Sequence, residues 1–181
     1  MYEDLVNRFV QKSYNYNKKE QEQIRAAAEF AAQAHGNQKR QSGEPYIIHP
    51  FAVGEILMGI NMDVETVLAG VLHDTLEDTP TTFDDLVDKF GKTVADLVEG
   101  ETKISGLEVK NKSQREAETI RKMFFAMSED IRVIIIKLAD KLHNMRTLQH
   151  LAPERAREIA NECLDIYAPL ADRLGMSWLK G

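Results

Sequence analysis

Residues that begin and end helices recur along almost the whole chain, and this pattern restricts the fold more than any other feature. Two segments resemble capping boxes, Asn17-x-x-Glu20 and Ser113-x-x-Glu116, in which a side chain at the helix start and an acid one turn later bond each other's backbone. Further start and stop residues are Pro50, Asp63, Thr82 and Gly91. These signals predict a mainly helical chain.

Only the run from Val133 to Ile136 is β-branched enough to resemble a strand. It continues without turn residues into Lys137 to Leu148, where apolar residues have helical spacing. We therefore predict one buried helix from Asp130 to His150 and an all-α fold. The least regular stretches, 36–50 and about 105–112, are predicted loops, which often carry binding groups.

The composition fits one soluble domain over residues 1–181, since 43% of the residues are hydrophobic. No run approaches the roughly 18 apolar residues of a membrane span, and the start Met-Tyr-Glu-Asp lacks signal-peptide features. A single cysteine, Cys163, excludes an internal disulfide and fits a reducing compartment. We therefore expect a cytoplasmic protein without membrane association.

The formal net charge of −6 argues against a broad surface for nucleic acid. We therefore expect no direct nucleic-acid binding. An anionic small molecule would have to be recognised locally, and Lys39 and Arg40 offer positive charge for that purpose.

The run Val71-Leu-His-Asp-Thr-Leu-Glu-Asp78 carries the most chemical information. On a continuous helix, at roughly 100° per residue, its four ionisable side chains share one arc. Carboxylates gathered beside a histidine raise one another's pKa and are costly to bury unless a cation lies among them. The run therefore favours a divalent metal ion near His73, Asp74, Glu77 and Asp78.

A second polar row lies in the predicted buried helix. Asp140 and Asn144 are four residues apart and share a face, which Thr147 extends. Taken alone, this row is also explained by hydrogen bonds between helices or by a salt bridge with Lys137 or Lys141.

Together with His49, which follows a loop rich in proline and glycine, the two polar rows suggest one ligand set. Its members are His49, His73, Asp74 and Asp140. Two imidazoles and two carboxylates suit manganese, iron or zinc, with positions left for water.

Several other residues receive an ordinary structural interpretation. His35, His143 and His150 are left outside the ligand set, and His35 suits a helix end beside Gly36. Tyr46 is explained equally well by packing under a bound nucleotide and by anchoring its loop. Packing is also the expected role of Trp178 and of the apolar stripe Ile159, Cys163, Ile166 and Leu170.

Three ordered blocks resemble the amino-terminal hydrolase domain of RelA/SpoT-type alarmone enzymes. They are Gly-Asn-Gln-Lys-Arg-Gln-Ser-Gly-Glu-Pro-Tyr-Ile-Ile-His-Pro (36–50), Gly-Val-Leu-His-Asp-Thr-Leu-Glu-Asp (70–78) and Lys-Leu-Ala-Asp-Lys-Leu-His-Asn-Met-Arg-Thr-Leu (137–148). Residues 166–175 are similar to the end of that domain. The resemblance implies an all-α HD-domain phosphohydrolase bundle that removes the 3′-diphosphate from guanosine tetra- and pentaphosphate, yielding GDP or GTP and pyrophosphate.

The resemblance also implies roles for individual residues. His49, His73, Asp74 and Asp140 match the metal ligands, with one Mn²⁺ as the cofactor, and Glu77 and Asp78 match the catalytic acids. The guanosine site corresponds to Arg40, Gln41, Ser42, Asn144 and Thr147. Position 41 departs from the family, which usually has a lysine there, because Gln41 can hydrogen-bond but carries no charge.

The resemblance leaves three questions open. Long members continue into a synthetase domain, so this chain is expected to be the amino-terminal part of a bifunctional protein. A regulatory module that binds the alarmone without turnover is one alternative to an active hydrolase, although Glu77 and Asp78 favour catalysis. Another HD phosphohydrolase of nucleotides is the second alternative, and the block at 36–50 argues against it.

Overall fold

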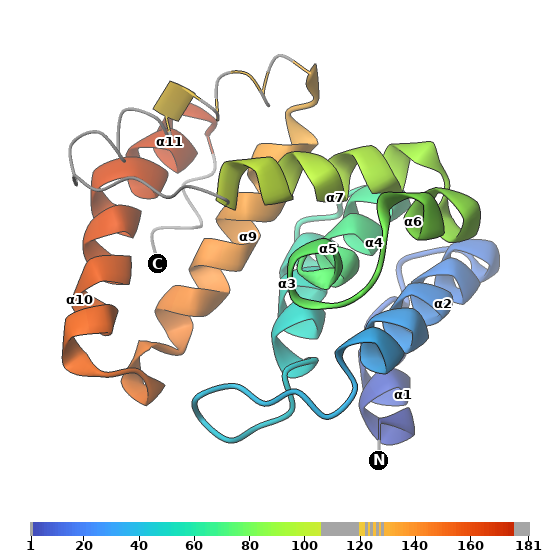
Figure 1. The fold of residues 1–181 in the computed structure, drawn as a ribbon. Coiled ribbons are helices and arrows are strands. Elements are labelled where there is room, and N and C mark those ends of the chain that lie inside the picture. The colour runs from blue at the N-terminus through green and yellow to red at the C-terminus, as the bar shows by residue number, and fades with distance from the viewer. Residues whose placement is uncertain are drawn as a thin grey trace.

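The computed structural model describes residues 2–105, 120, 121, 123, 125, 127 and 129–175, and their regular elements are helices (Figure 1). The first seven helices are α1 (Glu3–Gln11), α2 (Lys18–His35), α3 (Ile48–Gly59), α4 (Val64–Leu72), α5 (Thr75–Asp78), α6 (Phe83–Phe90) and α7 (Lys92–Ser105). They are followed by α9 (Arg132–Arg146), the 3-10 turn η1 (Leu148–His150), α10 (Pro153–Glu162), the π-helical turn η2 (Cys163–Tyr167) and α11 (Ala168–Arg173). The predicted all-α fold is confirmed.

The helix starts largely follow the predicted caps. Asn17 Oδ1 accepts a hydrogen bond of 3.0 Å from the Glu20 backbone, and a Glu20 carboxylate oxygen accepts one of 2.9 Å from the Asn17 backbone. The other confirmed signals are the caps Asp63 and Thr82 and the stop at Gly91. The capping box predicted at 113–116 and the loop predicted at about 105–112 lie wholly or almost wholly outside the described residues.

Helix α9 is shorter than the helix predicted from Asp130 to His150. It ends at Arg146, and the 3-10 turn follows after Thr147, whose φ of −120° and ψ of 13° leave the helical region. The Thr147 hydroxyl lies 3.1 Å from the His143 carbonyl and 3.2 Å from the Asn144 carbonyl, to which it can donate. The hydroxyl thus compensates carbonyls that have no further backbone partner at the end of the helix.

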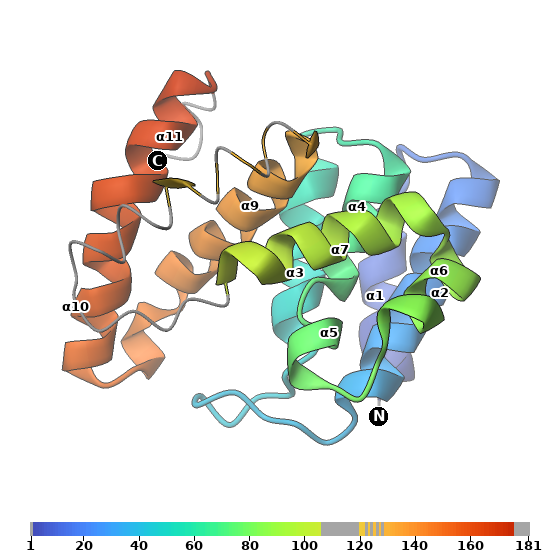
Figure 2. The ribbon, with the colours of Figure 1, turned by 45° about the horizontal axis from the view of Figure 1, so that its top comes forward.

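Helix α4 lies at the centre of the bundle, packed against α2, α3, α7 and α9 (Figures 1 and 2). Its residues from Thr66 to Leu72 are all buried, as expected for a helix surrounded by others. Gly70 permits a close approach of α3, because a Cβ atom there would lie 2.2 Å from Leu57 Cδ1. This contact holds α3 against the end of α4, where the polar residues begin.

Helix α10 and the π-helical turn lie beside α9, and the turn joins α10 to α11 (Figure 1). Cys163 and Ile166 are buried, and Ile159 and Leu170 pack against the core, which confirms their predicted packing role. Trp178 lies outside the described residues. None of the described helices is long and apolar enough to cross a bilayer.

Candidate metal centre and catalytic site

Three buried side chains from distant parts of the sequence meet in the bundle. His49 lies in the first turn of α3, His73 directly follows α4, and Asp140 belongs to α9. One potential ligand atom from each lies within 4.8 Å of the other two, and the three residues are only 4%, 1% and 5% exposed. The packing of α3, α4 and α9 thus brings together three of the four residues predicted as ligands.

The fourth predicted ligand, Asp74, is half-buried and adjoins this cluster. Its Oδ1 atom lies 3.1 Å from His73 Nε2, and its Oδ2 atom lies 3.6 Å from His49 Nε2. Burial alone would raise the pKa of Asp74, but the adjacent histidines His73 and His49 hold it well below its usual range. Asp74 is therefore a carboxylate that faces both imidazoles.

The His-Asp pair lies in a break between α4 and α5, so the continuous helix assumed for residues 71–78 is wrong. Helix α4 ends at Leu72, and Asp74 has a φ of −88° and a ψ of −6°. The Thr75 hydroxyl donates a 2.6 Å hydrogen bond to the Leu72 carbonyl, which satisfies a terminal acceptor of α4. A helical pattern could not reveal this break, because the pattern does not encode the local side-chain hydrogen bond that accompanies it.

The hydrogen bonds of His73 define its available ligand atom. Its Nδ1 atom lies 2.8 Å from the Gly70 carbonyl, which can only accept, so Nδ1 carries a proton. Its Nε2 atom is buried, and the nearest acceptor among the described residues, Asp74 Oδ1 at 3.1 Å, does not meet it with hydrogen-bond geometry. When this ring is neutral, the lone pair of Nε2 points into the cluster, where a metal ion would satisfy it.

His49 is oriented in a similar way. Its Nε2 atom lies 3.2 Å from Asp140 Oδ1, on the side of the cluster, while its Nδ1 atom lies 2.8 Å from His143 Nδ1. Burial, then the neighbouring His49 and Arg40, lower the pKa of His143 to about 4. A neutral His143 can accept the Nδ1 proton of His49, so a residue left outside the predicted ligand set orients one of its members.

Sequence reasoning missed His143, although a signal was present. It follows Asp140 by three residues, so both side chains lie on the same face of α9. Asn144, which is four residues after Asp140, was predicted from the same spacing, and its Nδ2 atom donates a 2.6 Å hydrogen bond to Asp140 Oδ1.

Asp140 also contacts a buried ion pair. Lys137 Nζ lies 2.6 Å from Glu101 Oε1 and 3.4 Å from Asp140 Oδ2, and all three side chains are almost fully buried. Burial alone would raise the pKa of Asp140, but Lys137, His49 and His73 hold it well below its usual range. The salt bridge with Lys137, offered as an alternative explanation for the polar row, exists alongside the cluster.

The charges around His73 fit a divalent cation. Burial disfavours a charged imidazole, yet Asp74, Glu101 and Asp140 outweigh burial and raise the pKa of His73 to about 10. The same negative charges that retain a proton on His73 would stabilise a cation held by deprotonated ligands. Two imidazoles and two carboxylates therefore fit a divalent metal ion.

The two acids predicted to be catalytic lie on α5 at the exposed rim of the cluster. Asp78 Oδ2 accepts a 2.8 Å hydrogen bond from the Tyr46 hydroxyl, which lies equally close to Asp74 Oδ2. Partial burial, together with the negative charges of Glu101 and Asp74, raises the pKa of Glu77 to about 7. Such a carboxyl group exchanges its proton near neutral pH.

Four of the five predicted substrate residues line a small pocket, and the fifth, Asn144, contacts Arg40. Arg40 donates hydrogen bonds of 3.1 Å to Asn144 Oδ1 and 3.3 Å to His143 Nδ1. The pocket is lined by Arg40, Gln41, Ser42, Glu44, Ile48, His143, Thr147, His150 and Leu151. Since Asn144 bonds both Arg40 and Asp140, the loop at 36–47 is directly linked to the candidate metal centre.

The comparisons with known proteins agree with this arrangement. The family described as "HD domain" matches residues 27–177. The bifunctional (p)ppGpp synthase/hydrolase SpoT of Escherichia coli K12 is 53% identical over 157 residues, which cover 87% of this chain and 22% of that protein. The guanosine-3′,5′-bis(diphosphate) 3′-pyrophosphohydrolase of Borreliella burgdorferi is 51% identical over 161 residues, covering 89% and 24%.

A solved structure supports the same family. It is that of a metazoan orthologue of SpoT, described as a protein that hydrolyses ppGpp and plays a role in starvation responses. It is 29% identical, with a TM-score of 0.60, and the match covers 83% of this chain and 85% of that one. The chain spans about a fifth to a quarter of the length of the curated relatives named above. From its sequence and its fold, the chain belongs to the HD domain family, in the group formed by the RelA/SpoT-type enzymes.

Proposed function

We propose that this domain is a pyrophosphohydrolase that removes the 3′-diphosphate of guanosine tetra- and pentaphosphate, releasing pyrophosphate and GDP or GTP. The names of the relatives support this activity. The proposal depends most on one observation: hydrogen bonds connect the candidate metal centre to the loop that carries Arg40. They run from Asp140 to Asn144 and from Asn144 to Arg40. One end of a polyanionic nucleotide would then meet Arg40 while its 3′-diphosphate meets the metal centre.

We propose that His49, His73, Asp74 and Asp140 hold one Mn²⁺ ion. Imidazole and carboxylate ligands suit this ion, although the same donors also bind iron and zinc. A divalent ion bound there would polarise a phosphoryl oxygen and lower the pKa of a water molecule. The protein residues around it would then have to hold the substrate, orient the water and accept a proton.

Glu77 and Asp78 are the carboxyl residues proposed to accept this proton. Glu77, with a pKa of about 7, suits a base that accepts a proton near neutral pH. Asp78 is fixed by the Tyr46 hydroxyl and adjoins Asp74 through that same hydroxyl. In this proposal Glu77 and Asp78 together position the attacking water and accept its proton.

Arg40, Ser42, Asn144 and Thr147 are the proposed contacts for the guanosine part, with Gln41 in place of the usual lysine. The planar guanidinium group of Arg40 can stack on a guanine ring and also supplies positive charge. Gln41 lines the same pocket but offers only neutral hydrogen bonds. Substrate charge must therefore be balanced by Arg40, by nearby Lys39 or Arg146, and by the metal.

The relatives are several times longer than this chain, and the name of one includes a synthase activity. We propose that this domain works in cis with a synthetase domain of a longer cytoplasmic protein. We propose that residues 1–181 form a single hydrolase domain.

A direct assay tests the proposed activity against a module that only binds the alarmone. The purified chain is incubated with guanosine tetraphosphate, with Mn²⁺ and with excess chelator, and the products are separated by anion exchange. Equal amounts of GDP and pyrophosphate, formed only with the metal, are expected. Binding of the nucleotide without any pyrophosphate release in Mn²⁺ would support the binding module and refute the hydrolase.

A further inference from the structure

The Tyr46 hydroxyl lies between two carboxylates that belong to different parts of the proposed chemistry. It is 2.8 Å from Oδ2 of Asp74, which faces the two histidines, and 2.8 Å from Oδ2 of Asp78 on the rim. A phenol has one proton to donate, so the two carboxylates share a single donor. The Tyr46 proton between the two carboxylates offsets their mutual repulsion.

The ring that carries this hydroxyl is held on several sides. It stacks on the buried ring of His35, with centroids 4.7 Å apart and an angle of 26° between the planes. The backbone N–H of Tyr46 donates to the Gln38 carbonyl at 2.9 Å, and its carbonyl accepts from the His49 N–H at 3.0 Å. The same Gln38 donates a 2.7 Å side-chain bond to the Asp78 carbonyl. The hydroxyl is therefore fixed relative to both α3 and α5.

The hydroxyl is the donor in both contacts. The oxygens that it meets belong to carboxylates, which accept hydrogen bonds, and a phenol has a proton to donate. Tyr46 is not among the residues that line the pocket beside Arg40.

We propose that Tyr46 is a positioning residue that couples the metal-ligand carboxylate of Asp74 to the catalytic carboxylate of Asp78. It fixes Oδ2 of Asp74 and, with the same proton, turns Asp78 toward the reacting water. This inference rests on the proposed function. It extends that function to Tyr46, for which the sequence allowed either packing under a nucleotide or anchoring of the loop.

The test is Tyr46→Phe, which retains the ring and its stacking on His35 and removes only the hydroxyl. Loss of a group that orients a metal ligand typically costs about 10–100-fold in metal affinity or activity. We expect kcat to fall by about that factor and the Mn²⁺ dissociation constant, measured by calorimetry without nucleotide, to rise. The KM for guanosine tetraphosphate should change less than about twofold, because Tyr46 is not in the pocket.

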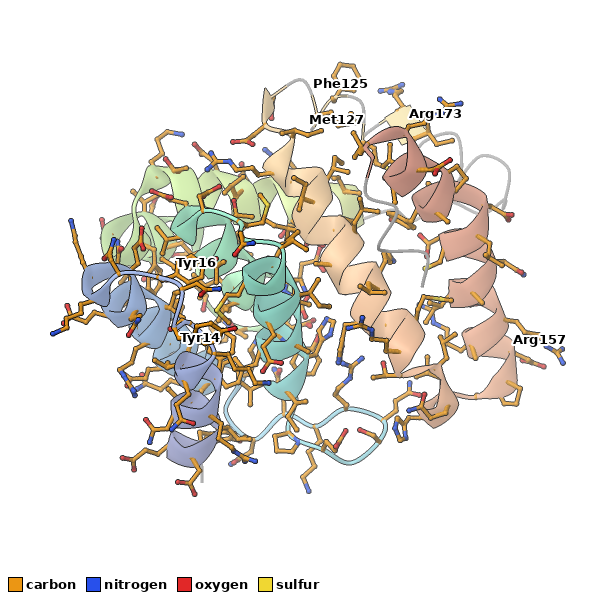
Figure 3. All side chains as sticks on the ribbon, turned by 180° about the vertical axis from the view of Figure 1, so that it is seen from behind. Tyr14, Tyr16, Phe125, Met127, Arg157 and Arg173 are labelled. Carbon is orange, nitrogen blue, oxygen red and sulfur yellow. The ribbon has the colours of Figure 1, made fainter. Side chains whose placement is uncertain are left out.

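Tyr16→Phe is the matched control, because the Tyr16 hydroxyl donates a 2.6 Å hydrogen bond to the Met62 carbonyl away from the site. Tyr16 lies in the segment between α1 and α2, on the far side of α3 from α9 (Figure 3). This control loses the same chemical group from a hydrogen bond outside the site, and the unfolding temperatures of both variants are measured beside their kinetics. Its kcat and its metal affinity should equal those of the original protein.

A loop-anchoring role predicts a different result for Tyr46→Phe. In that case KM would rise, since the loop carries Arg40, while kcat at saturation and Mn²⁺ affinity would stay within twofold, and the proposal would be overturned. The double variant of Tyr46→Phe with Asp78→Asn gives a second criterion. If Tyr46 acts through Asp78, the effects of the two single substitutions on kcat will not be additive in free energy, because coupled residues have non-additive effects. If the original protein does not hydrolyse the nucleotide, the proposed function fails, whereas the calorimetric comparison still decides the coupling to Asp74.

Discussion

His49 and His143 face each other Nδ1 to Nδ1 at 2.8 Å, and only one of them can donate the shared proton. His143 is the acceptor, because its pKa of about 4 keeps it neutral and Arg40 already donates toward the same nitrogen. This hydrogen bond leaves His49 Nε2 free to face Asp140 and Asp74. A histidine outside the proposed ligand set thereby orients one within it.

We predict that His143→Ala weakens Mn²⁺ binding by about 10–100-fold without unfolding the protein, because His49 loses the acceptor that fixes its ring. Calorimetric titration of Mn²⁺ into the metal-free proteins measures the effect. His150→Ala is a suitable comparison, since His150 is exposed and lines only the pocket. Equal Mn²⁺ affinity in His143→Ala and the original protein would contradict the orienting role.

A second prediction separates metal ligands from proton-transfer groups. Asp140→Ala should lose bound metal and turnover together, since Asp140 is buried within the cluster. Asp78→Ala should retain the metal and lose about 10²–10⁴-fold in kcat, the usual contribution of a positioned acid or base. Metal analysis and kinetics on the same preparations provide the measurement. Full metal occupancy and a normal rate in Asp140→Ala would refute its assignment.

Much of this site was predictable because its residues are marked by local patterns. Capping residues indicated the starts of α2, α4 and α6, and helical spacing placed Asp140 and Asn144 on one face. The convergence of His49 and His73 could only be suspected, since it depends on how α3 packs against α4 through positions such as Gly70.

Other features depend on hydrogen bonds that no periodic pattern encodes. The break at His73 and Asp74 and the end of α9 both involve threonine hydroxyls, of Thr75 and Thr147, that satisfy terminal carbonyls. The bridging position of Tyr46 depends on the path of a long loop, which spacing along the chain does not define. These contacts required the three-dimensional structure.

A third prediction concerns pH and Glu77. Its pKa in the folded chain is about 7, above the ordinary 4.5, so the folded state binds this proton more tightly than the unfolded state does. The resulting stabilisation is complete below pH 4.5 and is lost as the pH rises through about 7. Glu77→Gln, which cannot ionise, should therefore become more stable relative to the original protein as the pH increases from 5 to 8.

Unfolding temperatures of both proteins in chelator, measured at several pH values, test this expectation. The difference should be small, because Glu77 is exposed and solvent screens its charge. Saturating divalent metal should lower the pKa of Glu77, since a nearby cation stabilises the carboxylate. A stability difference that does not vary with pH in chelator would show that Glu77 has an ordinary pKa.

The last prediction concerns Gln41, a neutral side chain that lines the pocket with Arg40. Gln41→Lys should lower the KM for guanosine tetraphosphate by up to about fivefold, because an exposed charge pair contributes roughly 0.2–1 kcal/mol. The gain should shrink as salt is raised from about 0.01 M to 0.15 M, since the screening length falls from about 30 to 8 Å. Gln41→Met, similar in length but uncharged, should show no such gain, and kcat should stay unchanged in both variants. If lysine and methionine have the same effect at low salt, then charge at position 41 does not govern the affinity, and Arg40 with the metal centre suffices to hold the polyanion.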